Sequence, residues 1–226
     1  MAKEITVLYY TDNSLSEDIY SKCRKYLLLA AGGCPVVSVS QLPVDIGRNV
    51  CVGNIGRSFL SLYKQLAEGL RAVETEYVAL AEHDVLYPIG YFDWIPPRDD
   101  TFYYSGNTIW SVHKKGVQYG MYMTSATQHP SLESLICNKN LLSIAIGKRI
   151  SLLEKPTQPR PAGWGEPGFA YDDEQYEMRF LGIPIIDIRH NDNYTMRTGN
   201  FEKTFWVAEG WGRYDSIILS LHARSK

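Results

Sequence analysis

Apolar positions in the first part of the chain fall into short runs separated by longer periodic segments. The runs from Ile5 to Tyr10, Val36 to Val39 and Tyr77 to Ala81 are apolar and rich in β-branched or aromatic residues, which favours buried strands. The segment from Phe59 to Val73 instead places its apolar side chains on one helical stripe. Strands that alternate with helices are typical of a sheet with parallel strands.

A further helix is predicted between the first two strands. Ser14 or Ser16 can cap its amino end, and a glycine pair ends it after about Ala31. The segment from Pro43 to Gly53 is expected to be a loop.

Beyond Pro88 the pattern changes to short runs rich in tyrosine and tryptophan, which predict antiparallel strands over 101–104, 108–112 and 118–124. The elements expected after them are a helix from Ser131 to Ile146, a loop from Glu154 to Gly168, a helix from Asp172 to Leu181 and a strand from Ile183 to Ile188. Together the elements predict an α/β fold: a mixed, Rossmann-like sheet flanked by helices, with antiparallel strands in the second half.

Composition favours a single globular domain over residues 1–226. This length suffices for a sizeable core, and 45% hydrophobic residues argue against disorder. A net charge of -2 excludes a global attraction to nucleic acid or anionic membranes, although a local basic patch stays open. No apolar run is long enough for a membrane span and no signal-peptide pattern precedes the first strand, so we expect a cytoplasmic protein. The four cysteines lack zinc-site spacing and are expected to be buried free thiols: Cys23, Cys34, Cys51 and Cys137.

The triplet Glu82-His83-Asp84 is the most informative motif, because it puts two carboxylates at the end of an apolar strand. Burying a carboxylate is costly unless it is paired or bound to a cation. In open α/β sheets, ligands bind beyond the carboxyl ends of the strands. Residues two apart on an extended segment point to the same side, so Glu82 and Asp84 are expected to approach one hard cation that also holds phosphate oxygens. The alternative is a solvated turn.

The surroundings of this triplet resemble glycosyltransferases of the GT-A type, in particular the large inverting family two. A glycine-bearing loop from Gly53 to Ser58 opens the helix, and the phrase from Gly69 to Asp84 is similar to the A-x-G-E-Y-hydrophobic sequence that leads into the family's acid-x-acid metal motif. The chain departs from the commonest family form in having a glutamate for the first aspartate and a histidine in the middle.

This resemblance implies a divalent cation, Mn²⁺ or Mg²⁺, and a nucleotide-sugar donor, expected to be a UDP-sugar. It also implies that residues 1–90 or so bind the nucleotide-sugar, and that the half from about residue 91 to residue 226 binds the acceptor and carries the catalytic base.

A second acidic segment is the candidate for that base. Asp172, Asp173 and Arg179 match the family's spacing between an acidic pair that opens a helix and a later arginine. The resemblance makes Asp173 the base, which inverting transfer needs because the acceptor hydroxyl must lose its proton as it attacks the anomeric carbon. Glu166, in a glycine-flanked loop expected to close over the substrate, is the second candidate. Acids at a helix start are also stabilised by the helix dipole without any catalytic duty.

His190 follows the last predicted strand, and many GT-A enzymes add a histidine from this late position to the metal sphere. Imidazole with carboxylate suits Mn²⁺ better than Ca²⁺, with Mg²⁺ tolerated. The expected metal ligands are therefore Asp84, Glu82 and His190, although a structural role for His190 is the alternative. His83 is expected to point the opposite way along the strand, in a structural role.

Donor binding is expected from the first half of the chain. Thr11 and Asp12 follow the first strand, where the resemblance implies contacts to the base and ribose of a nucleotide. Arg57 lies near the amino end of a helix, where a planar guanidinium suits phosphate oxygens. With Glu82 these residues form the expected donor-binding set. An ordinary helix-capping turn at Asp12 and a surface charge at Arg57 are the alternatives.

The acceptor stays open between a glycan, a small molecule and hydroxymethylated bases of phage DNA. Aromatic faces stack on sugars and bases, but they also fill ordinary cores. The candidate aromatic residues are Tyr87, Tyr91, Trp94, Tyr103, Tyr104, Trp110, Tyr119, Tyr122, Trp164, Trp206 and Trp211. Two other classes fit the same features: a metal-dependent nucleotidyltransferase or phosphohydrolase, and a non-catalytic module that binds sugar or nucleic acid.

Overall fold

The computed structural model describes most of the chain in detail. The described residues are 4–112, 121–124, 128–155, 160, 163–169, 174–180, 182–190, 193 and 203–217.

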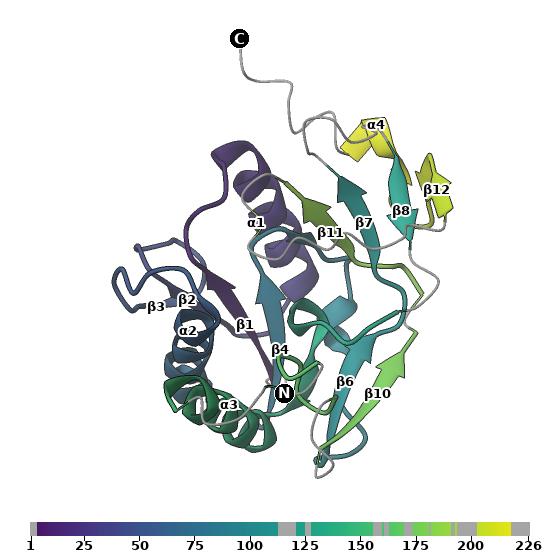
Figure 1. Cartoon of the computed structure of the whole chain (residues 1–226). Coiled ribbons are helices and arrows are strands. Elements are labelled where there is room, and N and C mark those ends of the chain that lie inside the picture. The colour runs from purple at the N-terminus through teal and green to yellow at the C-terminus, as the bar shows by residue number, and fades with distance from the viewer. Residues whose placement is uncertain are drawn as a thin grey trace.

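A seven-stranded mixed sheet forms the centre of this structure (Figure 1), with the strand order β10-β6-β9-β4-β1-β2-β3. Strand β1 pairs in parallel with β2 and β4, and β2 pairs in parallel with β3. Strand β9 runs antiparallel to both β4 and β6, while β10 runs parallel to β6. The bounds are β1 Ile5–Thr11, β2 Val36–Ser40, β3 Arg48–Cys51, β4 Tyr77–Glu82, β6 Thr101–Ser105, β9 Ile136–Asn138 and β10 Gln175–Arg179.

A second, five-stranded sheet has the order β12-β8-β7-β11-β5. Its strand β11 pairs in parallel with β7 and antiparallel with β5, which follows β4 after a short turn. A hairpin of two further strands lies near the end of the described chain. The bounds are β5 Val85–Leu86, β7 Ile109–Val112, β8 Tyr122–Thr124, β11 Ile186–Arg189, β12 Lys203–Phe205, β13 Val207–Ala208 and β14 Gly212–Arg213.

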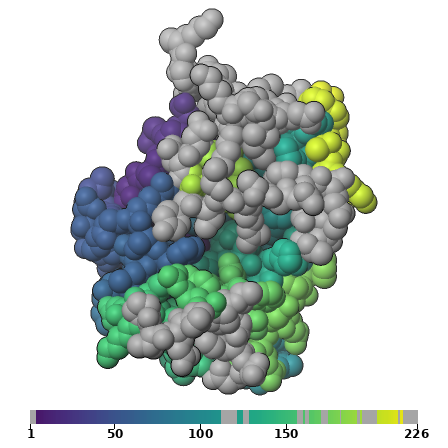
Figure 2. Space-filling view, viewed as in Figure 1, coloured from purple at the N-terminus to yellow at the C-terminus, as the bar shows by residue number. Residues whose placement is uncertain are grey.

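Helices cover both faces of the large sheet, because alternate side chains of its buried strands point to opposite faces. Leu8 of β1 packs with the side chains of α2 and α3, whereas Val7 packs with those of α1. Helices α2 and α3 lie side by side, and their surfaces adjoin in Figure 2. The bounds are α1 Glu17–Ala31, α2 Phe59–Ala72, α3 Lys139–Glu154, α4 Tyr214–Ile217, η1 Tyr91–Asp93 and η2 Leu132–Ser134.

The predicted fold class is confirmed, and so are the elements of the first half with one exception. The expected loop from Pro43 to Gly53 contains the edge strand β3, whose side chains are only partly buried and therefore gave a weak apolar signal. Ser16, one of the two predicted caps, lies at the N-cap position of α1, although its side chain makes no capping hydrogen bond. Gly32 ends this helix at a positive φ of 56°.

Two helix predictions in the second half need correction, one in its first part and one over its whole described part. The segment expected to be helical from Ser131 contains η2 and strand β9, and α3 begins only at Lys139. The Asn138 side chain caps α3 by accepting from the amides of Asn140 and Leu141. The apolar residues before this cap are needed to fill the gap between β4 and β6.

The other misassigned helix, from Asp172 to Leu181, is an edge strand over its described part. Strand β10 pairs with β6, and tertiary pairing at a sheet edge overrides a weak helical pattern. The last predicted strand appears as β11, shifted by a few residues.

The cysteines are free thiols as expected, and all but the exposed Cys51 are buried. Over the described residues, no helix combines the length and apolar character that crossing a membrane requires.

Candidate functional site

A cavity of about 330 Å³ opens at the carboxyl ends of β1, β2 and β4. Thr11 ends β1 and Glu82 ends β4, and both line this cavity together with Ser58, the cap of α2. Ser58 satisfies one of the first amides of α2 by accepting from the Ser61 amide at 3.0 Å. The cavity therefore combines the strand ends where α/β sheets bind ligands with the amino end of a helix, which favours anions.

The donor-side residues predicted from the sequence all line this cavity. Nε of Arg57 lies 2.6 Å from Oδ2 of Asp12. The Oδ1 atom of Asp12 accepts from the amide and the hydroxyl of Ser14, at 2.9 and 2.6 Å, so this carboxylate also makes the local capping turn. Burial disfavours the charged form of Asp12, but the Ser14 hydrogen bonds and the nearby His83 and Arg57 lower its pKa.

Two glutamines that the sequence analysis did not select complete this wall. The Gln41 side chain donates to the Gly56 carbonyl at 2.7 Å and accepts from the Ile55 amide at 3.2 Å, which fixes the glycine-bearing loop before α2. The Gln65 side chain donates to the Thr11 carbonyl at 2.9 Å. Neither residue belongs to a motif, so only the fold brings them to the cavity.

The acidic triplet is not extended, contrary to the expectation from the sequence. Strand β4 ends at Glu82, His83 and Asp84 form a turn, and β5 begins at Val85. The rule that alternate residues share a side therefore does not hold beyond Glu82. As a result, all three side chains of the triplet line the cavity, and His83 and Asp84 are buried.

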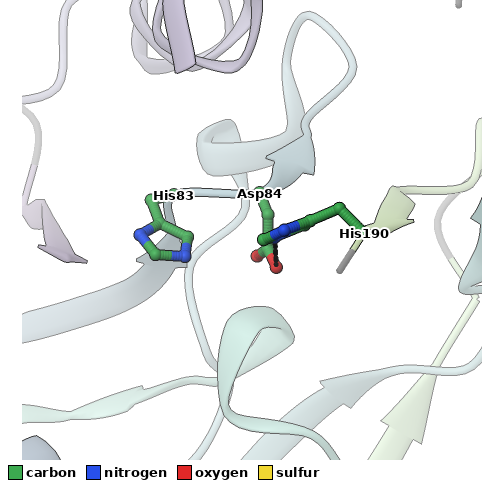
Figure 3. Close-up of side chains that lie close together, drawn as sticks. All are labelled: His83, Asp84 and His190. Carbon is green, nitrogen blue, oxygen red and sulfur yellow. Dashed lines mark ion pairs between the residues drawn. The ribbon is translucent and has the colours of Figure 1, made fainter. Parts of the chain in front are cut away.

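His83, Asp84 and His190 form the candidate metal cluster of the described residues (Figure 3). One ligand-type atom from each of the three lies within 4.8 Å of the other two. Nε2 of His190 lies 3.3 Å from Oδ2 of Asp84. The second sheet sets this geometry: β11 pairs with β5, and the Ile188 amide donates to the Asp84 carbonyl at 2.9 Å, so the chain reaches His190 beside the turn.

Asn193 holds this cluster together and was not predicted from the sequence. Its Nδ2 donates to Oδ2 of Asp84 at 2.6 Å, and its Oδ1 accepts from the His190 amide at 2.6 Å. Burial disfavours the charged form of Asp84, but the hydrogen bond to His190 and the nearby His83 and Arg189 lower its pKa. Burial lowers the pKa of His83, which favours the neutral imidazole that metals bind.

Glu82 lies in a more acidic part of the cavity floor. Its pKa is well above the usual range, first because of burial and then because of the nearby Asp84, Glu133 and Asp187 carboxylates, an effect that Arg189 partly offsets. Asp187 is engaged, since it pairs with Arg189 and accepts from Nε1 of Trp110 at 3.0 Å. Glu133 is buried, lines the cavity and was not selected as a site residue from the sequence, because a single acid carries no motif.

The loop from Gly163 to Phe169 forms the opposite wall and carries Glu166, which lines the cavity. Arg149 of α3 is fully buried and donates to the carbonyls of Gly165 and Glu166, at 3.2 and 2.9 Å. Arg149 also makes two hydrogen bonds of 3.1 Å to Glu174, whose carboxylate accepts from the Gly168 amide at 2.6 Å.

Two tyrosine hydroxyls complete the attachment of this loop. Tyr63 donates to the Gly165 carbonyl at 2.8 Å, and Tyr104 donates to the Pro167 carbonyl at 2.6 Å. The loop from Gly163 to Phe169, which we expected to close over the substrate, is thus held by these hydrogen bonds as one wall of the cavity.

The predicted base Asp173 and its neighbour Asp172 lie outside the described residues. Arg179, which the sequence analysis linked to them, lies on β10 with its guanidinium 4.8 Å from the ring centres of both Tyr91 and Trp94.

Most of the aromatic residues proposed for the acceptor are core residues. Tyr87, Tyr103 and Tyr104, for example, are almost fully buried. Trp164 is the member of the candidate set that lines the cavity within the described part of the chain. The Trp164 ring lies edge-on to that of Phe59, with 5.2 Å between the ring centres. The guanidinium of Arg160 lies 4.9 Å from the centre of the Trp164 ring.

Comparisons with known proteins give one solved structure to report. No protein-family model matches the chain, and the search of curated proteins finds no match. A glycosyltransferase involved in the glycosylation of the major capsid of PBCV-1 is similar, with 13% sequence identity and a TM-score of 0.44. The similarity covers 81% of this chain and 91% of that chain.

Proposed function

We propose that this protein is a metal-dependent glycosyltransferase of the GT-A type, which moves a sugar from a UDP-sugar to an acceptor hydroxyl with inversion. The observation that carries the proposal is one cavity lined both by the Asp12 and Arg57 pair and by His83 and Asp84. These last two residues form a metal-compatible cluster with His190, which lies beside Asp84. The resemblance of the segment from Gly69 to Asp84 to the family's metal motif supports the same reading.

The residues of the cluster fit the cation that the proposal needs. Two imidazoles and a carboxylate suit Mn²⁺, and Mg²⁺ less well. Asp84, His190 and His83 would hold the ion, which supplies positive charge to offset that of the diphosphate leaving group. Buried ligand atoms at a strand end are the kind of site that a cation and a phosphate complete together.

The other wall of the cavity would hold the nucleoside. Asp12 can accept from a ribose hydroxyl or from a base N–H, and Arg57 can donate two parallel hydrogen bonds to phosphate oxygens. Their contact at 2.6 Å keeps the guanidinium next to the amino end of α2, where anions are favoured. Glu82 faces the same space and contributes to the donor pocket.

Proton removal from the acceptor falls to a carboxylate. Glu166 lines the cavity on a fastened loop, and the family resemblance points to Asp173, so these two are the proposed bases. Either one would take the hydroxyl proton as the oxygen attacks the anomeric carbon from the face opposite the leaving UDP. Trp164 offers a face or edge for the acceptor, which we propose to be a glycan, a small molecule or a modified DNA base.

A second candidate function is supported by the acidic floor of the cavity. Glu82, Asp84, Glu133 and Asp187 all line it, and clustered carboxylates also serve metal-dependent phosphohydrolases and nucleotidyltransferases. The products separate the two classes, because a glycosyltransferase releases UDP whereas the alternatives release UMP with a sugar phosphate, inorganic phosphate or pyrophosphate.

The test is to incubate the protein with UDP-sugars, Mn²⁺ and a panel of acceptors, to follow the phosphate products by ³¹P NMR and to read the anomeric configuration of the sugar by ¹H NMR. We expect UDP to appear, with slow transfer to water when no acceptor is present, and the released sugar to have inverted anomeric configuration. Asp84→Asn should lower the rate at least about a hundredfold, because removal of one key electrostatic group costs about 2.7–4 kcal/mol.

Asp99→Asn is the matched control for this experiment. Asp99 is exposed and accepts from the hydroxyl of Tyr77, the first residue of β4. It therefore lies at the amino end of this strand, whereas Asp84 follows the carboxyl end. A wild-type rate in Asp84→Asn, or phosphate-containing products other than UDP, would remove the proposed function.

A further inference from the structure

The turn at His83 and Asp84 gives the middle residue of the acidic triplet a place that its sequence pattern does not predict. On an extended strand His83 would point away from Glu82 and Asp84. Because β4 ends at Glu82, the His83 ring instead enters the cavity beside Asp84, and Figure 3 shows one of its nitrogens facing the Asp84 carboxylate.

A hydrogen bond fixes the orientation of this ring. Nδ1 of His83 lies 2.7 Å from Oγ1 of Thr11 and 3.7 Å from Oδ1 of Asp12. Thr11 Oγ1 also accepts from the Asn13 amide at 2.9 Å, and its two lone pairs allow it to accept from His83 as well. With its proton on Nδ1, His83 keeps an electron pair on Nε2. Metal-binding histidines typically have this arrangement, in which the second ring nitrogen donates to an oxygen of the protein.

Glu82 is held differently, although it belongs to the same triplet. Its amide donates to the Tyr87 hydroxyl at 3.0 Å, and that hydroxyl donates to the Glu133 carbonyl at 2.8 Å. Tyr87 therefore ties the end of β4 to η2, on the side of the acidic floor. Among the described residues, the cluster that can surround one ion contains His83, Asp84 and His190, and not Glu82.

We infer that His83, and not Glu82, completes the protein ligands of the cation together with Asp84 and His190, and that Thr11 positions it. The inference rests on the metal site of the proposed function. It replaces Glu82 of the ligand set expected from the sequence by His83, which gives two imidazoles and one carboxylate. It also gives Thr11 a role toward the metal in addition to any contact with the nucleotide.

Mn²⁺ alone, added to the purified full chain, tests this assignment without any substrate. Free Mn²⁺ is counted by electron paramagnetic resonance for the wild type, His83→Gln and Glu82→Gln, with His129→Gln as the control, since His129 is exposed and is not among the residues that line the cavity. We expect His83→Gln to weaken Mn²⁺ binding at least about tenfold. Glu82→Gln and His129→Gln should change it less than about threefold.

A second measurement keeps the inference testable if His83→Gln does not fold. Electron spin echo modulation of Mn²⁺ bound to the wild type should show the coupling of two imidazole nitrogens. One coupled nitrogen, equal losses in His83→Gln and His129→Gln, a greater loss in Glu82→Gln, or no binding of Mn²⁺ to the wild type would overturn the ligand assignment. Binding with the predicted ligands but without release of UDP would overturn the proposed function and leave the assignment standing.

Discussion

The two sides of the cavity are built on different principles. The loop wall from Gly163 to Phe169 is fastened by donors that already have their acceptors, above all the buried pair of Arg149 and Glu174. The metal-compatible floor brings ligand-type atoms of His83, Asp84 and His190 together, and Asn193 binds the same carboxylate. The hydrogen bonds that hold the wall are made within the protein. The floor instead gathers three ligand-type atoms that a cation could bind.

This difference predicts that the two sides of the cavity respond differently to substrate and to metal. A fastened wall keeps Trp164 and Glu166 in place before a substrate enters, which under the proposed function would preorganise the acceptor side. Under the proposed function the floor would be completed by an ion, so binding of the donor phosphates should depend on the metal. Variants of the wall should therefore change the stability of the fold, and variants of the floor should change the affinity for Mn²⁺.

The largest effect is expected from Arg149→Ala. The change leaves Glu174 buried without its main partner and removes two hydrogen bonds to the loop, so the free energy of unfolding should fall by about 3–5 kcal/mol. Urea denaturation without metal measures it. Lys148→Ala is the control, because Lys148 is partly exposed and lies 4.0 Å from the same carboxylate, and it should cost less than about 1 kcal/mol. Equal losses in both variants would mean that the buried pair does not hold the wall.

The sequence predicted the parts of the fold that depend on local periodicity. The strands ending at Thr11 and Glu82 and the helix from Phe59 have strong patterns, and the structure confirms them. Strand β10 was misassigned because its pairing with β6 is a contact between segments far apart in the chain. Only the three-dimensional arrangement places it at the sheet edge.

The site was predictable to the extent that motifs mark strand ends. Asp84 and His190 were selected from the sequence, and they lie side by side, with 3.3 Å between Oδ2 of Asp84 and Nε2 of His190. The position of His83 in the cavity was not predictable, because the alternation rule assumes an extended chain and the chain turns there. Asn193 and Glu133 carry no pattern of their own, and reach the site through the pairing of β11 and the position of η2.

A moderate effect, on the affinity of the floor for Mn²⁺, is expected from Asn193→Ala. Loss of its hydrogen bonds to Asp84 and to the His190 amide removes the group that orients both ligands. The affinity for Mn²⁺ should fall about 10- to 100-fold, as for other residues that hold metal ligands. Calorimetric titration with Mn²⁺ measures this. Asn107→Ala, which removes a hydrogen bond to the Gly182 carbonyl, should leave the affinity unchanged. The comparison of wall and floor fails if Arg149→Ala, once folded, weakens Mn²⁺ binding as much as Asn193→Ala does.

The smallest effect is expected from Tyr104→Phe in the wall. The change removes only the hydroxyl that donates to the Pro167 carbonyl at 2.6 Å and should cost about 1 kcal/mol. Tyr176→Phe is the control, since Tyr176 is 39% exposed and its ring remains in place. Thermal unfolding with and without Mn²⁺ should give the same loss for Tyr104→Phe. A loss that disappears on addition of Mn²⁺ would show that the wall, too, depends on the cation.

The central claim is that one cavity binds a divalent cation and a nucleoside diphosphate together. Calorimetric titration of UDP into the protein, with and without Mn²⁺, tests it most directly. The account predicts that Mn²⁺ tightens UDP binding at least about tenfold, a coupling of about 1.4 kcal/mol. The coupling should vanish in Asp84→Asn and persist in Asp99→Asn. Equal affinity for UDP with and without Mn²⁺, or a coupling that survives in Asp84→Asn, would contradict the account.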